Sequence, residues 1–197
     1  MCGILKIEMS ESCQEILDPR IRRTRQLLHE ALAKLLEKKE FEKISVQDIA
    51  EASTVNRATF YDHYADKFAL LQCMVGARFQ EFLSVRHVQF DGACSAALKT
   101  LVWGLCDYLA STPGMACERQ RPMQPHMEAA VITVVRWMLL EGLQKHPSSR
   151  QVSAEMLATT VSWAIYGAAK EWLQTPNRSG SEEMAETVVG LISPMMV

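Results

Sequence analysis

The sequence predicts an all-α protein, and three observations lead to this fold class. Proline and glycine are sparse, with 7 and 9 residues among 197, and they gather between apolar stretches. Within those stretches, hydrophobic residues recur at the spacing of one helix face. Residues 45–67 also contain matched helix-start signals. We therefore expect about nine helices, arranged as a three-helix helix-turn-helix head and a larger helical body.

Charge is distributed unevenly along the chain, although the formal net charge is only −2. A basic surface on a nearly neutral chain indicates a protein that touches nucleic acid at one end only. Ordinary solvated helix surfaces would account for the same charges, so the motif at 45–67 is needed to decide between the two. The basic residues concerned are Arg20, Arg22, Arg23, Arg25, Lys38, Lys39, Lys43, Arg57 and Lys67.

The six cysteines are scattered and include no C-x-x-C pair. With no signal peptide expected, we predict a reduced, cytoplasmic setting in which Cys73 and Cys106 act as small core residues. No apolar run approaches the roughly 20 residues that a membrane span needs. The sequence also lacks a Gly-rich phosphate loop and an H-E-x-x-H metal motif, so we expect no metal, no cofactor and no enzymatic activity.

The chain is predicted to begin with an arm and a long helix. Residues 1–18 have weak periodicity, and we expect a mobile arm there. Pro19 precedes a helix predicted at 20–39, which opens a head spanning 19–66. One face of this helix carries an apolar stripe made of Leu28, Ala31, Leu32, Leu35 and Leu36.

A short helix with a well-marked start follows. Ser45 is a good N-cap, and Asp48 at the third helical position completes a capping box. Ile44 and Ile49 occupy the two positions of a hydrophobic staple. The helix is predicted to end near Ala52.

A second short helix follows a turn at 53–55. Asn56 is its N-cap, and it is predicted to end near His63 or Tyr64. A helix of two turns is not stable alone, so its neighbours must hold it. Phe60 and Tyr64 fall on one face and are expected to pack inward.

The other faces of this helix have the composition of a recognition helix. Ala58 permits close approach and can touch a thymine methyl group, while Arg57 can read guanine. Asp62 can accept a hydrogen bond from cytosine N4. The side chains on the flanks that can donate to phosphate oxygens are Thr59, Tyr61 and His63.

Asp66 and Lys67 mark the start of the next helix, with Asp66 as a third N-cap. A lysine at the first helical position opposes the helix dipole. Lys67 is therefore explained by an anion bound at this helix end, such as a DNA phosphate. Lysines also occupy helix starts by chance.

The body is predicted to contain helices at 66–86, 93–110, 126–145, 153–173 and 181–193. The last two are rich in apolar and small residues, which let helices approach closely. We expect them to form a subunit interface, because both are too apolar for a solvated face. An intramolecular core is the alternative.

Residues 20–67 resemble the DNA-binding domain of the TetR family of bacterial transcription regulators. The resemblance rests on the strings 45–52 and 55–67, and Leu70 and Leu71 follow them. The most specific part reads Thr-Phe-Tyr-x-His-Tyr-x-x-Lys.

This chain departs from the family pattern at two places. Ser53 and Thr54 stand where the family commonly has Ala-Gly, and Ala58 stands where a glycine is frequent. Thr54 is expected to need a less relaxed turn conformation. Asp62 places an acidic group on the DNA-facing surface, and we expect it to restrict the set of operator sequences that the protein binds.

The resemblance implies a homodimer that binds a palindromic operator, with half-sites about one helical turn apart. The body, at 67–197, would bind a small molecule that releases the DNA, so that the protein acts as a repressor. The helices within 153–193 would pair across the dimer. The residues that the resemblance implies as DNA contacts are Arg23, Thr24, Ser45, Val46, Arg57, Ala58, Thr59, Tyr61, Asp62, His63 and Lys67.

An effector pocket would lie mainly among the helices between residues 66 and 145. Methionines and aromatic residues suit an adaptable apolar pocket, although each candidate also fits an ordinary core. The candidates are Trp103, Cys106, Met123, His126, Met127, Trp137 and Tyr166.

Two alternatives belong to other classes of function. An enzyme could use His126 with Glu128, or Cys106 with its neighbour Asp107, but neither pair has a third group at an interpretable spacing. A DNA-binding regulator of the same fold could instead respond to a protein partner, or to oxidation of Cys106 or Cys117.

Overall fold

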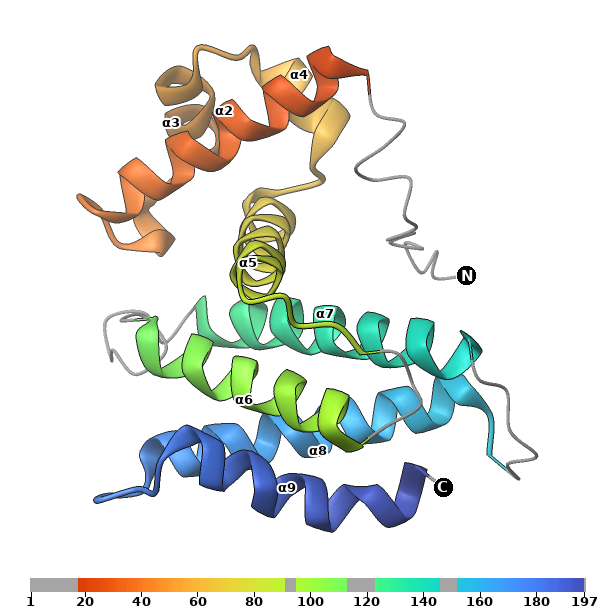
Figure 1. Cartoon of the computed structure of the whole chain (residues 1–197). Helices are drawn as coiled ribbons and strands as arrows, with labels where there is room; N and C mark the ends of the chain where they lie inside the picture. The colour runs from red at the N-terminus through yellow and green to blue at the C-terminus, as the bar shows by residue number, and fades with distance from the viewer. Residues whose placement is uncertain (1–17, 91–94, 113–122, 146–151, 197) are drawn as a thin grey trace. The chain divides into compact units, whose positions relative to one another are not determined.

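The computed structural model describes residues 18–90, 95–112, 123–145 and 152–196. Within these ranges the chain forms eight α-helices, one short 3-10 helix and no strand, which confirms the all-α prediction (Figure 1). The elements are α2 (Pro19–Leu36), η1 (Phe41–Lys43), α3 (Val46–Ser53), α4 (Arg57–His63), α5 (Lys67–Val85), α6 (Ser95–Ser111), α7 (Gln124–Lys145), α8 (Ala154–Gln174) and α9 (Ser181–Met196).

The chain divides into two compact units, Met1–Leu70 and Leu71–Val197, which we call the head and the body. The boundary lies inside α5, slightly later than the division at 66/67 expected from the sequence. The first turn of α5 explains the difference, because its side chains complete the head. Leu70 is fully buried, and the Phe68 ring packs edge-on against Phe41 with their centroids 5.3 Å apart.

Helix α2 starts and packs largely as its sequence predicts. Asp18 is its N-cap, and the Asp18 Oδ1 atom accepts a hydrogen bond from the Arg20 amide at 2.9 Å. Leu28, Ala31 and Leu32 of the apolar stripe are buried. The helix ends at Leu36 and not at Lys39, because the chain turns there through hydrogen bonds from the amides of residues 38 and 39 to the Leu35 carbonyl.

The predicted capping box at the start of α3 is present. Ser45 Oγ accepts from the Asp48 amide at 3.1 Å, and Asp48 Oδ2 accepts from the Ser45 amide at 2.8 Å. The hydrogen bond from Lys39 Nζ to Asp48, together with those from Ser45, holds the pKa of the Asp48 carboxyl well below its usual range. Ile44 and Ile49, the two staple residues, are buried.

Helix α3 ends at Ser53, and its C-cap residue Thr54 adopts the left-handed conformation, with φ 56° and ψ 28°. This backbone conformation is costly for a β-branched residue and nearly free for glycine. The structure thus confirms that Thr54 requires a strained turn. The preceding Ser53 is buried, and its hydroxyl donates to the Ile49 carbonyl at 2.7 Å.

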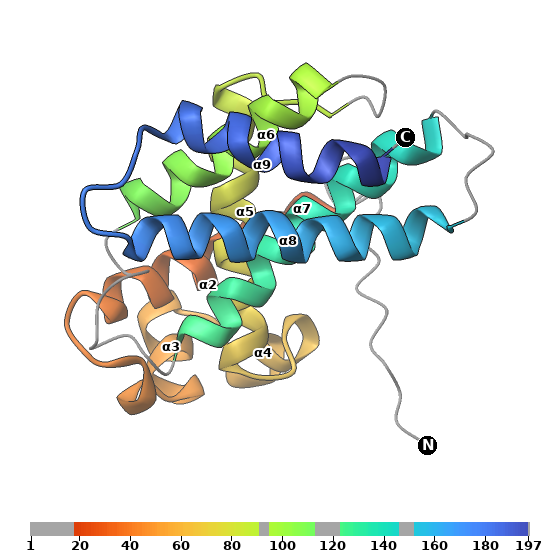
Figure 2. The same cartoon turned by 90° about the horizontal axis from the view of Figure 1, so that it is seen from below.

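In the body, α8 packs against α7, α6 and α9, and α6 also packs against α9 (Figures 1 and 2). The core between these helices is apolar. Gly104 of α6 permits a close approach to α5, since a Cβ atom there would lie 2.8 Å from Leu83 Cδ2. The buried side chains at the centre include Leu101, Leu105, Val131, Val135, Leu139, Val161, Ile165 and Ala169.

The last helix differs from its prediction at one end. Proline is disfavoured inside a helix, so the sequence places the end of α9 before Pro194. The structure continues the helix through Pro194 to Met196. Among the described helices, none combines the length and apolar character needed to cross a membrane.

Candidate nucleic-acid interface

Helix α4 is anchored by two aromatic side chains and exposes the rest. Phe60 is 0% exposed and Tyr64 is 6% exposed, as the sequence predicts. The Tyr64 hydroxyl lies 3.0 Å from His29 Nε2 of α2, so the anchor joins α4 to the first helix. The exposed residues of α4 are Arg57, Ala58, Tyr61 and Asp62, and the half-exposed ones are Thr59 and His63.

Arg57 and Tyr61 form a polar pair along the exposed face of α4. The Arg57 guanidinium donates to the Tyr61 hydroxyl at 3.3 Å and lies 5.7 Å from the centroid of its ring. An arginine supported in this way keeps most of its N–H donors available in a planar fork. That fork is suited to the O6 and N7 acceptors of guanine.

His63 lies at the end of α4, where burial disfavours its charged form. Burial, and then the charge of Arg25, lower the pKa of the His63 imidazole, while the Asp62 carboxylate raises it. The neutral ring retains one N–H donor. His63 can therefore donate to a phosphate in either protonation state, since the charged ring carries two N–H donors.

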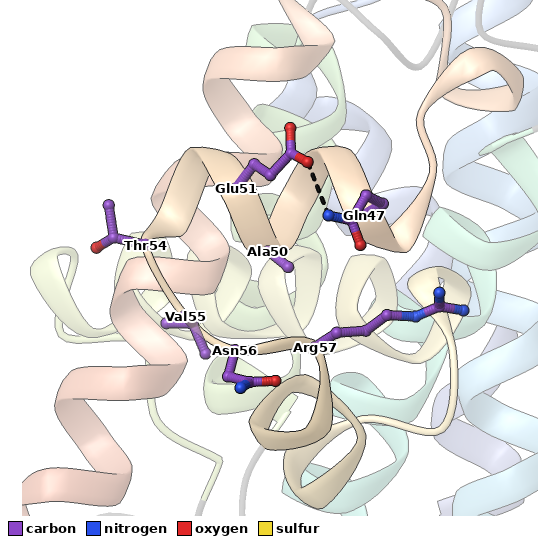
Figure 3. A pocket seen from close by; sticks show the side chains of 7 residues that line it. All are labelled: Gln47, Ala50, Glu51, Thr54, Val55, Asn56 and Arg57. Atoms are coloured by element: carbon purple, nitrogen blue, oxygen red, sulfur yellow. Dashed lines mark hydrogen bonds between the residues drawn. The ribbon is translucent and has the colours of Figure 1, made fainter.

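A groove of about 480 Å³ lies between α3 and α4 (Figure 3). Gln47 of α3 and Arg57 of α4 both border it, and the Gln47 Nε2 atom donates to Glu51 Oε1 at 2.7 Å. A glutamine amide can read adenine, so Gln47 is a base-reading candidate that the sequence analysis missed. Its exposed position in the first turn of the helix before α4 was the available signal. The lining residues are Gln47, Ala50, Glu51, Thr54, Val55, Asn56 and Arg57.

Ser45 and Val46 lie at the start of α3, where backbone N–H groups can donate to a DNA phosphate. Val46 is the first residue of α3, and the first N–H groups of a helix have no partner within it. The Ser45 hydroxyl is held by the capping box and donates to Asp48 Oδ2 at 2.6 Å. A phosphate here would therefore meet backbone N–H groups and not the serine hydroxyl.

Helix α2 contributes Arg23, whose side chain is exposed, and Thr24, which is half-exposed. The Thr24 hydroxyl donates to the Arg20 carbonyl at 3.0 Å. A hydroxyl has one hydrogen, and a phosphate needs a donor. In this conformation the hydroxyl hydrogen of Thr24 is used within α2, and the phosphate contact expected of its side chain stays a prediction.

Lys67 also has partners other than those expected. Its ammonium donates to the backbone carbonyls of Phe41, Glu42 and Ile44 at 2.9, 3.1 and 2.8 Å. All three N–H donors are used within the head. In the conformation described, no N–H donor of this side chain is left for a phosphate, and the predicted phosphate contact stays a prediction. The third N-cap is confirmed, because Asp66 Oδ1 accepts from the Ala69 amide at 2.8 Å.

The ligand candidates of the body are spread over α6, α7 and α8, and Met123 directly precedes α7. Cys106, Met123, Met127 and Tyr166 are buried, while His126 and Trp137 are half-buried. Trp103 is 39% exposed, and its indole N–H donates to Ser181 Oγ at 3.0 Å, so it links α6 to α9. The groove in the head contains none of these residues.

The buried thiol of Cys106 bears on the oxidation alternative. Burial, and then the nearby Asp107, raise the pKa of Cys106 to about 12. The thiolate is the reactive form, so this thiol is unreactive near neutral pH. Cys117, the other cysteine considered for redox control, lies outside the described residues. Within the described residues, no cluster of three or more His, Cys, Asp and Glu side chains has the arrangement of a metal site.

Comparison with known proteins agrees with the geometry of the head. Residues 28–74 match the profile of the bacterial regulatory proteins of the tetR family. An uncharacterized HTH-type transcriptional regulator, YxbF of Bacillus subtilis (strain 168), is 47% identical over 60 residues. That match covers 30% of this chain and 16% of the relative's length.

Two solved structures share the fold of most of the chain. Thermus thermophilus FadR, described as a TetR-family transcriptional repressor in complex with lauroyl-CoA, has a TM-score of 0.57 and 19% identity, covering 88% of this chain and 95% of that one. The dihydroxyacetone kinase operon activator DhaS has a TM-score of 0.50 and 17% identity, covering 88% and 96%. The family is one of regulatory proteins, in agreement with the expectation that the chain is not an enzyme. The helix-turn-helix head of this chain therefore matches the tetR family of bacterial regulatory proteins over residues 28–74, and its all-helical body shares the fold of these solved structures.

Proposed function

We propose that the chain is a sequence-specific transcriptional regulator that binds a palindromic operator as a homodimer in the cytoplasm and is released by a small-molecule effector. The observation that carries this proposal is helix α4. Two buried aromatic residues anchor it, and one small side chain and several hydrogen-bonding ones lie on its exposed side. Such a face fits the major groove of DNA.

The contacts divide into those that read bases and those that position the backbone. Arg57, Ala58, Asp62 and the added residue Gln47 face the bases. Phosphate contacts come from Arg23, Thr59, Tyr61, His63 and the first N–H groups of α3. At Lys67, only the backbone N–H at the start of α5 stays available for a phosphate.

Arg57→Ala and Arg23→Ala remove the same charge, yet they are expected to act differently. Arg57→Ala should cost about 1–3 kcal/mol on the preferred site and relax the preference at one base pair. Arg23→Ala should weaken all sites alike and reduce the salt slope by about one. Selection from a randomised half-site, followed by salt titration, measures both effects. If the two variants lost base preference equally, the proposed division into base-reading and phosphate-binding residues would be contradicted.

DNA binding should become stronger as the pH falls from about 7.5 to 6, at constant salt. A phosphate beside His63 raises its pKa above the lowered value of the free head, so binding takes up a proton. The stability of the free head depends on pH in the opposite direction, because the unfolded chain binds a proton at His63 more tightly than the folded head does. The free energy of unfolding therefore decreases as the pH falls below about 6.5. Each pKa unit corresponds to roughly tenfold in affinity. His63→Gln should remove this dependence, and an unchanged pH profile in that variant would reject the contact.

The proposed dimer interface is the face formed by α8 and α9, which lie side by side (Figure 2). Met156 and Trp163 of α8 are each 60% exposed, and Leu191 of α9 is 71% exposed. A Cβ atom added at Gly167 or Gly190 would meet nothing within 4 Å, so there is space for a close approach by another helix. Large exposed apolar side chains on adjacent helices favour a second copy as the partner.

The proposed effector is an apolar small molecule bound in the body. The methionine and aromatic candidates there suit an adaptable apolar pocket. Thermus thermophilus FadR is a transcriptional repressor solved in complex with lauroyl-CoA, whereas DhaS is an operon activator. We favour repression for this chain, with activation as the other outcome of a reporter assay at the natural promoter.

The experiment that tests the function is selection of bound genomic fragments, followed by salt titration on the best one. Enrichment of a palindrome, with affinity that falls steeply with salt, would support a dimeric sequence-specific regulator. Binding that is weak and equal for all fragments would contradict it. Release by a screened ligand would then separate ligand control from control by a protein partner or by oxidation.

A further inference from the structure

We propose that Lys67 is a positioning residue, whose ammonium holds the start of α3 in place and does not itself bind DNA. This rests on the proposed function only for the role of α3 in DNA binding. The structural part of the inference concerns the head alone. Lys67 is the first residue of α5, and its side chain reaches back to the segment before α3.

The surroundings of the ammonium satisfy it completely. The carbonyls of Phe41, Glu42 and Ile44 accept its three N–H donors at 2.8 to 3.1 Å. The Nζ atom also lies 4.7 Å from the ring centroid of Phe41 and 5.7 Å from that of Phe68. Cation–π contacts and carbonyl oxygens together stabilise the charge in a half-buried site. Reaching a phosphate would require breaking all of these interactions.

The three carbonyls belong to one segment, in which the Phe41 carbonyl also accepts from the Ile44 amide at 3.1 Å. This segment is the 3-10 helix Phe41–Lys43 and the residue that follows it. Its carbonyls sit where the chain changes direction, and the hydrogen bonds from Lys67 to Phe41 and Ile44 are partly buried, where a hydrogen-bond partner for a carbonyl matters most. Lys67 thus serves as a cap for a turn that lies 23 to 26 residues earlier in the chain.

The position of this turn determines where α3 begins. Ile44, whose carbonyl makes the shortest of the three hydrogen bonds, directly precedes the N-cap Ser45. The first turn of α3 follows, with the N–H groups and the Gln47 side chain that we assign to DNA. Lys67 therefore affects DNA binding indirectly, because it fixes the position of α3. Its ammonium is surrounded by carbonyl oxygens and does not face the phosphates.

Three variants of the full chain separate this role from a phosphate contact. Lys67→Met removes the donors and the charge. Lys67→Arg keeps the charge, but a planar guanidinium cannot direct three N–H groups to carbonyls around one point. Lys43→Met is the matched control, because Lys43 lies on the same short helix with its side chain 72% exposed in an ion pair with Glu40.

Hydrogen exchange of the amides of residues 44–50 is measured first, without DNA, so its outcome does not depend on the proposed function. Both Lys67 variants should exchange at least tenfold faster than the parent, and Lys43→Met should stay within twofold. Salt titration on the selected operator is the second measurement. Lys67→Met should weaken binding with an unchanged salt slope, because no phosphate contact is lost.

The opposite pattern would overturn the proposal. In that pattern, the amides of Lys67→Met would exchange as fast as those of the parent, and the salt slope of its DNA binding would fall by about one. Lys67→Arg would bind the operator as tightly as the parent. If Lys67→Met prevents folding of the head, Lys67→Gln retains two N–H donors and allows the same two measurements in a folded protein. An unchanged exchange rate in Lys67→Gln, together with a reduced slope, would also reject the positioning role.

Discussion

Phe60→Ala is expected to lower the free energy of unfolding of the head by about 3–5 kcal/mol, the usual cost of truncating a fully buried phenylalanine. Phe60 is 0% exposed, and its ring centroid lies 6.0 Å from that of Tyr64, the other anchor of α4. A helix of seven residues has little stability of its own, so the loss should detach α4 and abolish DNA binding. Chemical denaturation followed by circular dichroism would measure the change.

The control for this experiment is the neighbouring aromatic residue. Tyr61 belongs to the same helix but is 48% exposed. Tyr61→Ala should therefore cost less than about 1 kcal/mol of stability, while it still weakens DNA binding by removing a proposed phosphate contact. Equal destabilisation by the two variants would mean that burial of Phe60 does not hold α4 in place.

Leu191→Glu, combined with Trp163→Glu, is expected to convert the proposed dimer into a monomer. Each substitution would bury a carboxylate without a partner in the interface, and such burial costs several kcal/mol. A monomer has one recognition helix, so operator affinity should fall by about 10²-fold or more through loss of the linked second half-site. Sedimentation velocity and operator titration on the same samples measure the two effects.

Val85 offers a matched control for this change. It is also 71% exposed, but it lies at the end of α5, away from α8 and α9 in the sequence. Val85→Glu should leave the oligomeric state and the operator affinity close to those of the parent. A parent that sediments as a monomer, or dissociation caused by Val85→Glu alone, would rule out the face formed by α8 and α9.

The local features of the head could be predicted because they depend on neighbours in the sequence. The capping box of Ser45 and Asp48 spans three residues, and the inward face of α4 follows from helical periodicity. Thr54 was expected to be strained because the family often has glycine there, and the structure places it in the left-handed region. The distribution of aromatic and polar residues on α4 needed no tertiary information.

Contacts between distant segments could not be predicted in the same way. The partners of Lys67 lie more than 20 residues away, and they are backbone carbonyls, which leave no mark in the sequence. An exposed lysine at a helix start and one that caps a remote turn therefore look alike. The Thr24 hydroxyl is a different case, because donation to the carbonyl four residues earlier is a common local alternative for a threonine within a helix.

The body was less predictable than the head because the residues that line a pocket have no local signature. Trp103 was chosen as a ligand candidate for its chemistry, yet it lies at the surface and bonds to Ser181. Cys106 is deeply buried, as an ordinary core residue would be. The approximate helix bounds followed from periodicity, although about nine helices were expected and the described residues form eight. The arrangement of side chains depends on how the helices pack.

The position of the unit boundary within α5 bears on the construction of hybrid regulators. A hybrid that joins a foreign body directly after Asp66 would lose Lys67, Phe68 and Leu70, although all three complete the interior of the head. The exchange point should instead fall after Leu70, inside the continuous helix. The hybrid then keeps the head together with the α5 side chains that stabilise it, so it should keep the operator specificity of this chain. The helical register of α5 must be preserved across the junction.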